Sequence, residues 1–171
     1  MSRLLIARIV AVSLLMFVVS ACGWHLRGAV SLPRQLERPM VTGVDETQEL
    51  IPLVEQRLVE AGGVPVSDAA SASLTIELQT VEYRRQTIAV DQEGRPLTYQ
   101  LIYRLGYRYY QPDLVDKAKS GQVTASINYQ YDSNQVLSKS AEEVRVKKQL
   151  QDDLALRLLQ QLSVRLGANE D

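Results

Sequence analysis

Residues 98–110, TYQLIYRLGYRYY, contain the clearest alternation of apolar and polar side chains in this protein. One set of alternate positions is Tyr99, Leu101, Tyr103, Leu105, Tyr107 and Tyr109, and the opposite set includes Thr98, Gln100, Arg104 and Arg108. A period of two residues is typical of a β-strand with one buried and one exposed face. Because leucines share the aromatic face, the tyrosine row is predicted to be core in preference to a ligand platform. Tyr110 has the opposite parity and is predicted to be an exposed aromatic residue.

Two further strands flank this segment along the chain. Residues 74–78 alternate before it, lose phase at 80–81 and are predicted to continue to Val90 after a bulge. The composition of residues 91–96 predicts a turn. Residues 112–121 are predicted to be a polar connection, after which the alternation resumes over 123–131. Consecutive strands joined by short turns are expected to pair antiparallel.

Two helices are predicted on either side of these strands. Apolar residues recur at helical spacing between residues 50 and 61, and Gly62 and Gly63 are suited to end that helix. A longer helix is predicted over 141–166, where Ser140 and Glu143 have the spacing of a capping box. Its apolar stripe is Leu150, Leu154, Leu158 and Leu162.

These elements predict an α+β fold. A short strand at 40–42, ending at Gly43, brings the number of strands to about four. Each helix has one apolar stripe and the strands share one apolar face, so burial of both requires two layers. The predicted architecture is a two-layer sandwich, with two helices packed on one face of a mostly antiparallel sheet. Residues 40–171 would form a single α/β sandwich domain.

The N-terminal residues predict export. Arg3 and Arg8 precede an apolar run over 9–19, and small residues at 20–21 come directly before Cys22. This is the pattern of a bacterial lipoprotein signal peptide, here residues 1–21, that is cleaved before the cysteine. An uncleaved transmembrane helix is the alternative. It is disfavoured because the run is shorter than the roughly 20 residues that span a bilayer.

Cys22 is the only cysteine in the chain and is the predicted site of lipidation. The expected modification is a covalent diacylglycerol together with an N-acyl lipid, since two or more acyl chains hold a protein stably at a membrane. Residues 22–39 would then be a lipidated tether. Gly23 stands where aspartate often marks retention in the inner membrane, so an outer-membrane location is favoured.

Composition excludes several function classes. Of 19 basic residues, Arg3 and Arg8 precede Cys22, so the processed chain carries 17 basic against 20 acidic residues, a net charge of −3. This charge suggests no nucleic-acid partner. His25 is the only histidine, which removes the usual base for a serine nucleophile and the usual zinc ligands. We therefore predict no enzyme, no metal site and no cofactor.

Basic residues suggest a site for an anion. Arg84, Arg85 and Arg95 lie near predicted strand ends or turns, and Lys139 precedes the second helix. Arginine guanidinium groups suit phosphate oxygens, so these residues are candidates for binding the head group of an anionic glycolipid. The alternative is that they are ordinary solvated residues.

Two segments resemble a known family. Residues 21–28, ACGWHLRG, followed by Leu32 and Pro33, are similar to the start of the lipopolysaccharide-assembly lipoprotein family, LptE. Residues 97–103, LTYQLIY, resemble that family's strand after a glycine turn. The predicted order of strand, helix, three strands and long helix also matches, so the resemblance extends over nearly all of the processed chain.

The resemblance implies a function. Members of this family are outer-membrane lipoproteins that plug the LptD β-barrel, aid its assembly and bind lipopolysaccharide for insertion into the outer leaflet. By the family pattern, Lys139 is the best placed lipopolysaccharide ligand, and Arg95 lies near a basic family position. The implied partners are an LptD-type barrel, lipopolysaccharide and, through the lipid anchor on the periplasmic side, the membrane. A lipoprotein that scaffolds another envelope complex, such as a cell-wall synthase activator or a transporter accessory, stays the alternative.

Overall fold

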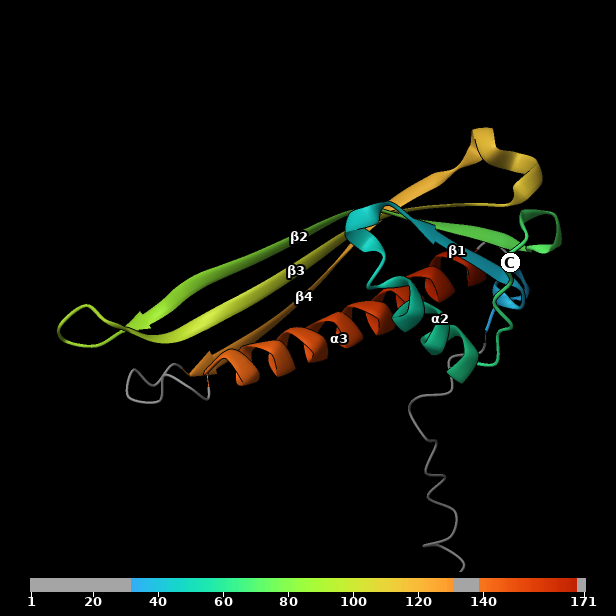
Figure 1. Cartoon of the computed structure of the whole chain (residues 1–171). Coiled ribbons are helices and arrows are strands. Elements are labelled where there is room, and N and C mark those ends of the chain that lie inside the picture. Colours follow the sequence, from blue (N-terminus) through green and yellow to red (C-terminus); the bar gives the residue numbers. More distant parts are fainter. Residues whose placement is uncertain (1–31, 131–138, 169–171) are drawn as a thin grey trace, which may run out of the picture.

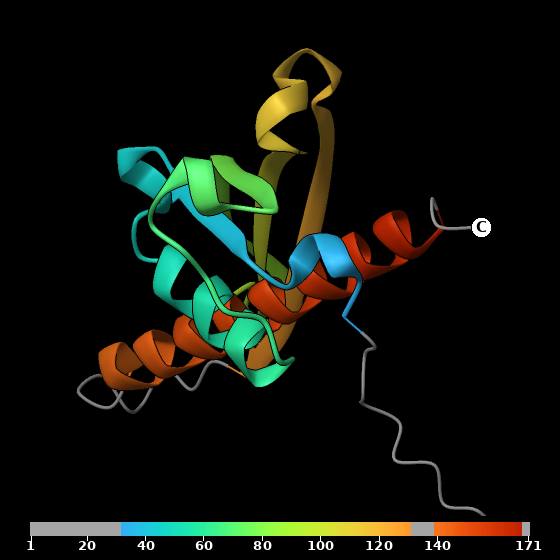
Figure 2. The ribbon, with the colours of Figure 1, turned by 90° about the vertical axis from the view of Figure 1, so that its right-hand side faces the viewer.

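A computed structural model of the chain describes residues 32–130 and 139–168. It shows a sheet with two helices on the same face, the predicted two-layer arrangement (Figures 1 and 2). The strands are β1 (Pro39–Gly43), β2 (Leu74–Val90), β3 (Pro96–Tyr110) and β4 (Lys119–Gln130), and the helices are α2 (Ile51–Glu60) and α3 (Lys139–Gly167). The predicted α+β class and the layer order are confirmed.

The sheet has the order β1-β2-β3-β4 and is mostly antiparallel. Only β1 is parallel to its neighbour, because the connection from β1 to β2 passes through α2. β2 pairs with β3 through a long hairpin whose register shifts between Leu78 and Thr80, where the sequence loses its phase. β1 ends at Gly43, so the far halves of β2, β3 and β4 form a three-stranded ribbon (Figure 1).

Helix α2 has the local signals that its sequence predicts. Pro52 lies in the first turn, where its missing N–H costs nothing. Gly62 adopts a φ of 98°, which closes the helix, and the Gly63 N–H donates to the Leu58 carbonyl at 2.8 Å. Arg57 links this helix to α3 through a 2.7 Å bond from Nη2 to Oδ2 of Asp152.

The core lies between α3 and the alternating face of β3. Leu101, Leu105 and Tyr107 are fully buried there. Tyr103 and Tyr109 of the tyrosine row are also core as predicted, whereas Tyr99 is only half-buried. The opposing stripe of α3 is buried from Val146 to Leu166 and comprises Val146, Leu150, Leu154, Leu158, Leu162 and Leu166. The buried Tyr107 hydroxyl donates to Oε1 of Gln161 at 2.9 Å, so the one polar atom of that ring has a partner.

Strand β4 begins earlier than the sequence predicts. Residues 112–117 form a short 3₁₀ turn, and pairing with β3 starts at Lys119, opposite Tyr109. Gly121 lies opposite Tyr107, and a Cβ there would stand only 2.5 Å from the phenol oxygen. The glycine that suggested a loop is therefore a strand residue that makes room for an aromatic ring.

The packed part of the chain begins before residue 40. Leu36 is fully buried in the core, and Pro39 is the first residue of β1. The Val64 N–H donates to the carbonyl of Glu37 at 2.7 Å, which fixes this segment against the connection that follows α2. Among the described residues, no helix is both long enough and apolar enough to cross a bilayer.

The stripe of α3 provides a stability test. Leu158 is fully buried and Leu156, one half-turn away, is 37% exposed. We expect Leu158→Ala to lower the free energy of unfolding by about 2–5 kcal/mol, because it leaves a cavity in the core. Leu156→Ala is the matched control and should cost less than about 1 kcal/mol. Urea unfolding of the two variants measures both values, and equal losses would contradict this packing.

Candidate functional site

The basic candidates gather toward one end of the molecule, which we call the hairpin end. It comprises the turn at residues 91–95, the adjoining parts of β2, β3 and β4, and the start of α3. Figure 1 shows this end far from β1 and α2, at the tip of the ribbon. The beginning of the described chain, drawn in blue, lies toward the opposite end (Figure 1).

Arg84 lies on the outer face of the sheet, away from the helices. Its Nη2 is 2.9 Å from Oε1 of Glu82, whose other oxygen accepts from Arg104 at 3.2 Å. The hydrogen bond from Arg104 is the largest cause that lowers the pKa of Glu82, and the bond from Arg84 lowers it to a smaller extent. Nearer β1, Arg108 pairs with Glu77 on the same face at 2.6 Å. This outer face is polar, as the sequence predicts, and its charges are paired.

Arg85 lies on the opposite face, the one covered by α3. Its guanidinium is 5.0 Å from the centre of the Tyr99 ring and 3.5 Å from Oε2 of Glu143 on α3. The Tyr83 hydroxyl donates to the other oxygen of Glu143 at 3.2 Å. Tyr129 of β4 packs 5.7 Å from Tyr99 and closes the group. We call Tyr83, Arg85, Tyr99, Tyr129 and Glu143 the aromatic cluster.

Arg95 belongs to the hairpin turn itself. Its Nε and Nη2 pair with Asp91 and Glu93 at 2.6 and 2.9 Å, and its side chain is 65% exposed. Asp91 also accepts the backbone N–H groups of Arg95 and Glu93, at 2.7 and 3.0 Å. The Arg95 N–H is the largest cause that lowers the pKa of Asp91. Gly94 has a φ of 80°, which this tight turn requires.

Lys139 is the first residue of α3. Its backbone lies at the hairpin end, but its side chain falls outside the described part of the structure, as does that of Ser140 in the predicted capping box. Cys22 also lies outside the described residues.

The structure brings the candidates to one end without joining them in one cluster. Arg84 and Arg85 are adjacent in sequence and therefore point to opposite faces of β2. Each described candidate is paired with at least one carboxylate. Exposed ion pairs contribute only about 0–1 kcal/mol, so a multivalent anion with several phosphates can displace these carboxylates. The arrangement suits reversible contacts with such an anion.

Sequence reasoning missed the aromatic cluster. The bulge after Leu78 exchanges the two faces of β2, so Val81, Tyr83 and Arg85 follow Leu78 on the helix side. The loss of phase at 80–81 was the available signal. With the exchanged phase, Arg85 falls opposite Leu101, on the aromatic face of β3.

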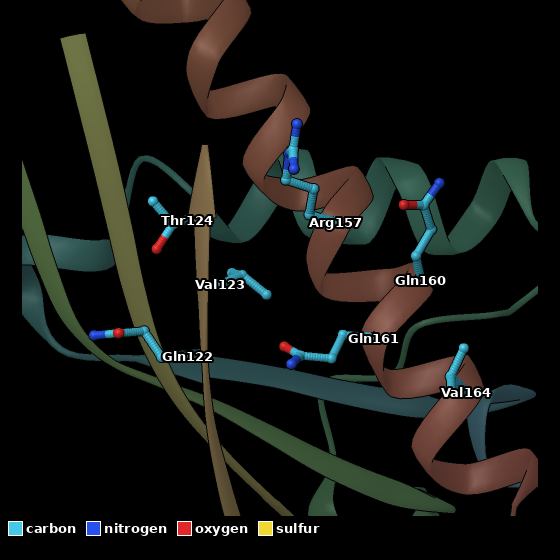
Figure 3. A pocket seen from close by; sticks show the side chains of 7 residues that line it. All are labelled: Gln122, Val123, Thr124, Arg157, Gln160, Gln161 and Val164. Carbon is cyan, nitrogen blue, oxygen red and sulfur yellow. The ribbon is translucent and has the colours of Figure 1, made fainter. Parts of the chain in front are cut away.

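A groove lies beside the edge strand β4. It has a volume of about 430 Å³ and is open to solvent. Figure 3 shows its lining, which comes from β4 on one side and α3 on the other: Gln122, Val123, Thr124, Arg157, Gln160, Gln161 and Val164. Arg157 pairs with Asp153 at 2.9 Å, so the groove has little net charge.

Tyr110 is only partly exposed, where the sequence predicts an exposed aromatic residue. The Arg108 guanidinium covers its ring at 5.4 Å from the centre. The ring also lines a second cavity of about 340 Å³ with Leu114 and Leu166, near the end of α3.

Comparison with known proteins gives one consistent family. The family model described as "LptE: Lipopolysaccharide-assembly" matches residues 40–162. The chain is 26% identical over 151 residues to the LPS-assembly lipoprotein LptE of Photorhabdus laumondii. The aligned region covers 87% of this chain and 81% of that relative. It is 23% identical over 158 residues to the protein of the same name from Pectobacterium atrosepticum, with 92% and 85% covered.

Solved structures show the same fold. The rare lipoprotein B of Shewanella oneidensis superposes with a TM-score of 0.67 at 26% identity, over 78% of this chain and 99% of that one. A lipoprotein B of Nitrosomonas europaea gives a TM-score of 0.69 at 24% identity, over 85% and 94%.

The aromatic cluster predicts a dependence of stability on pH. Burial, followed by the charge and hydrogen bond of Glu143, raises the pKa of Tyr83 from 10.0 to about 12. The folded state thus favours neutral Tyr83, which stabilises the protein fully below pH 10, and this contribution disappears as the pH rises through 12. We expect the free energy of unfolding to fall over this range and Tyr83→Phe to reduce that fall. Chemical unfolding at several pH values measures it, with Tyr110→Phe, outside the cluster, as control. An unchanged slope in Tyr83→Phe would contradict the cluster.

Proposed function

The chain belongs to the LptE family of lipopolysaccharide-assembly proteins, and from this premise we propose that it plugs an LptD-type β-barrel in the outer membrane, aids the assembly of that barrel and binds lipopolysaccharide for insertion into the outer leaflet. The family is one of non-enzymatic lipoproteins. The match over residues 40–162, nearly the whole described domain, is the observation that carries the proposal.

The polar outer face of the sheet supports the proposal that the domain lies inside a hydrated barrel. Its charged residues are paired within the face, as in Arg108–Glu77 and Arg104–Glu82. Between these pairs lie short polar side chains of β4, such as Thr124 and Ser126, which are exposed. Such a face offers donors and acceptors without large desolvation costs, which suits a polar wall with bridging water.

The proposed lipid anchor determines at which leaflet of the membrane the protein is held. We propose that Cys22 carries the diacylglycerol and N-acyl lipid and holds the protein at the periplasmic leaflet of the outer membrane. Residues 22–31 then connect the anchor to Leu32, where the described domain begins at the end opposite the hairpin (Figure 1).

We propose that lipopolysaccharide is bound at the hairpin end. Arg95 is highly exposed at the tip, and Lys139 starts α3 at the same end. Arg84 and Arg85 lie farther along β2, one on each face, and would make secondary contacts. The phosphates of lipid A are the groups that guanidinium and ammonium donors would recognise.

Co-purification tests the proposed function. We expect the tagged full chain, extracted from outer membranes in mild detergent, to bring down an LptD-type barrel in roughly equal amount, because a plug requires one partner per copy. Mass spectrometry of the complex identifies the partner. Recovery of a cell-wall synthase or a transporter in place of the barrel would favour the scaffold alternative and contradict the proposal.

Charge removal tests the lipopolysaccharide contacts. We expect the double variant Arg95→Gln/Lys139→Gln to bind lipopolysaccharide at least about tenfold more weakly, because each charge-assisted hydrogen bond contributes about 1.5–3 kcal/mol. Its affinity should also depend less on salt, since fewer ionic contacts remain. A pull-down across a salt series measures both effects. Lys148→Gln, an exposed lysine farther along α3, is the control. Binding equal to wild type at every salt concentration would contradict these contacts.

A further inference from the structure

The two long edges of the sheet differ in how they are protected from pairing with another strand. Beyond β1, the edge of β2 carries Glu82, Arg84 and Arg85 and is interrupted by register shifts after Leu78 and Thr87. Charges and bulges are the usual means by which an edge strand avoids unwanted pairing. The edge of β2 is therefore protected.

The edge formed by β4 lacks these features. Its register with β3 is regular from Lys119 to Gln130, without a shift. Residues 120–130, SGQVTASINYQ, contain no charged residue and no proline. Within the described part of the chain, no strand pairs with its outer side. A regular, uncharged edge of this length favours strand addition.

The backbone of β4 presents its groups toward that open side at every second residue. The Ser120 carbonyl accepts a bond from Nη1 of Arg165 on α3 at 3.0 Å, so it points away from β3 at the start of the strand. Outward-pointing groups recur with a period of two in an antiparallel ladder. The N–H and C=O of Gln122, Thr124 and Ser126 therefore face the same open side.

The groove between β4 and α3 provides space for the side chains of an added strand. It lies beside Gln122, Val123 and Thr124, and its far wall is α3 (Figure 3). Val164 in that wall is 71% exposed, an apolar side chain without cover in the described structure. Amide groups from Gln160 and Gln161 and the Arg157 guanidinium, which is paired with Asp153 at 2.9 Å, line the rest of the wall. Inward residues of an added strand would meet one apolar side chain, neutral amide groups and a guanidinium that already has a carboxylate partner.

We propose that β4 is a strand-addition site for an extended, uncharged segment of the protein that encloses this domain, which is the LptD-type barrel if the proposed function is correct. Charge supports this occupant. A charged segment would lose water beside eleven uncharged residues, and Arg157, the charged residue that lines the groove, is already paired with Asp153. The position of the edge supports the same occupant. The edge is continuous with the face proposed to meet the barrel wall, because the exposed polar residues Thr124 and Ser126 belong to both.

Variants of the edge test the proposal in the full-length, lipidated protein. Thr124→Pro removes an N–H that points outward and leaves the ladder with β3 intact. Ser126→Lys places a protecting charge on the edge without altering the backbone. We expect each to reduce the co-purified barrel by about fivefold or more, because the proline removes one outward backbone donor and the lysine charge must lose water when a strand is added. Thr124→Ala, which keeps the N–H, and Gln86→Lys, on the protected edge of β2, should match wild type.

A photo-crosslinking residue at position 126 identifies the occupant, and melting temperatures show that each variant is folded. A crosslink to the barrel supports the proposal, whereas a crosslink only to a second copy of this chain, or to no protein, overturns it. If wild type brings down the barrel and both edge variants do so equally, strand addition is wrong and the proposed function stands. If wild type brings down no barrel, the proposed function fails first.

Discussion

The fold depends on the contact between the leucine stripe of α3 and the alternating face of β3. Within residues 32–130 and 139–168, α3 is the helix that covers the ribbon of β2, β3 and β4 beyond the end of β1, and it buries the apolar side of that ribbon (Figure 1). A two-stranded hairpin alone is marginally stable in water, and a sheet becomes stable only when further strands or a helix bury its apolar face. Burial of Leu101, Leu105 and Leu158 between the two layers is therefore the condition for an extended sheet that still exposes its other face.

Much of this architecture could be predicted because its signals are local and periodic. The alternation over residues 98–110 and the stripe from Leu150 to Leu162 each report one buried face, and two such faces require two layers. The parallel pairing of β1 with β2 could not be predicted in this way, since it depends on a contact between residues 39–43 and 74–78 through α2. The early start of β4 was hidden for another reason. Gly121 has no side chain to continue the alternation. The reason for a glycine at this position is the ring of Tyr107, which occupies the space of a Cβ, and only the folded structure shows that contact.

The candidate site was less predictable than the fold. Arg84 and Arg85 are neighbours in the sequence, but the pleat of β2 directs their side chains to opposite faces of the sheet. Because the bulge after Leu78 exchanges the two faces of β2, Arg85 lies on the helix side, in the aromatic cluster. The sequence also does not show every carboxylate that pairs with these basic residues. Asp91 and Glu93 are close in sequence to Arg95, but Glu143 reaches Arg85 across 58 residues. A row of basic residues in a sequence therefore overstated the free positive charge at the hairpin end.

The length of β2 has a consequence for where the two ends of the domain can be. Seventeen residues at about 3.3 Å each extend roughly 55 Å, whereas the hydrocarbon interior of a bilayer is only about 30 Å thick. The first described residues lie near one end of this strand and the hairpin near the other. Under the proposed anchoring at Cys22, with the ribbon directed across the membrane, this length is enough for Arg95 to reach the level of the opposite leaflet without any change of conformation.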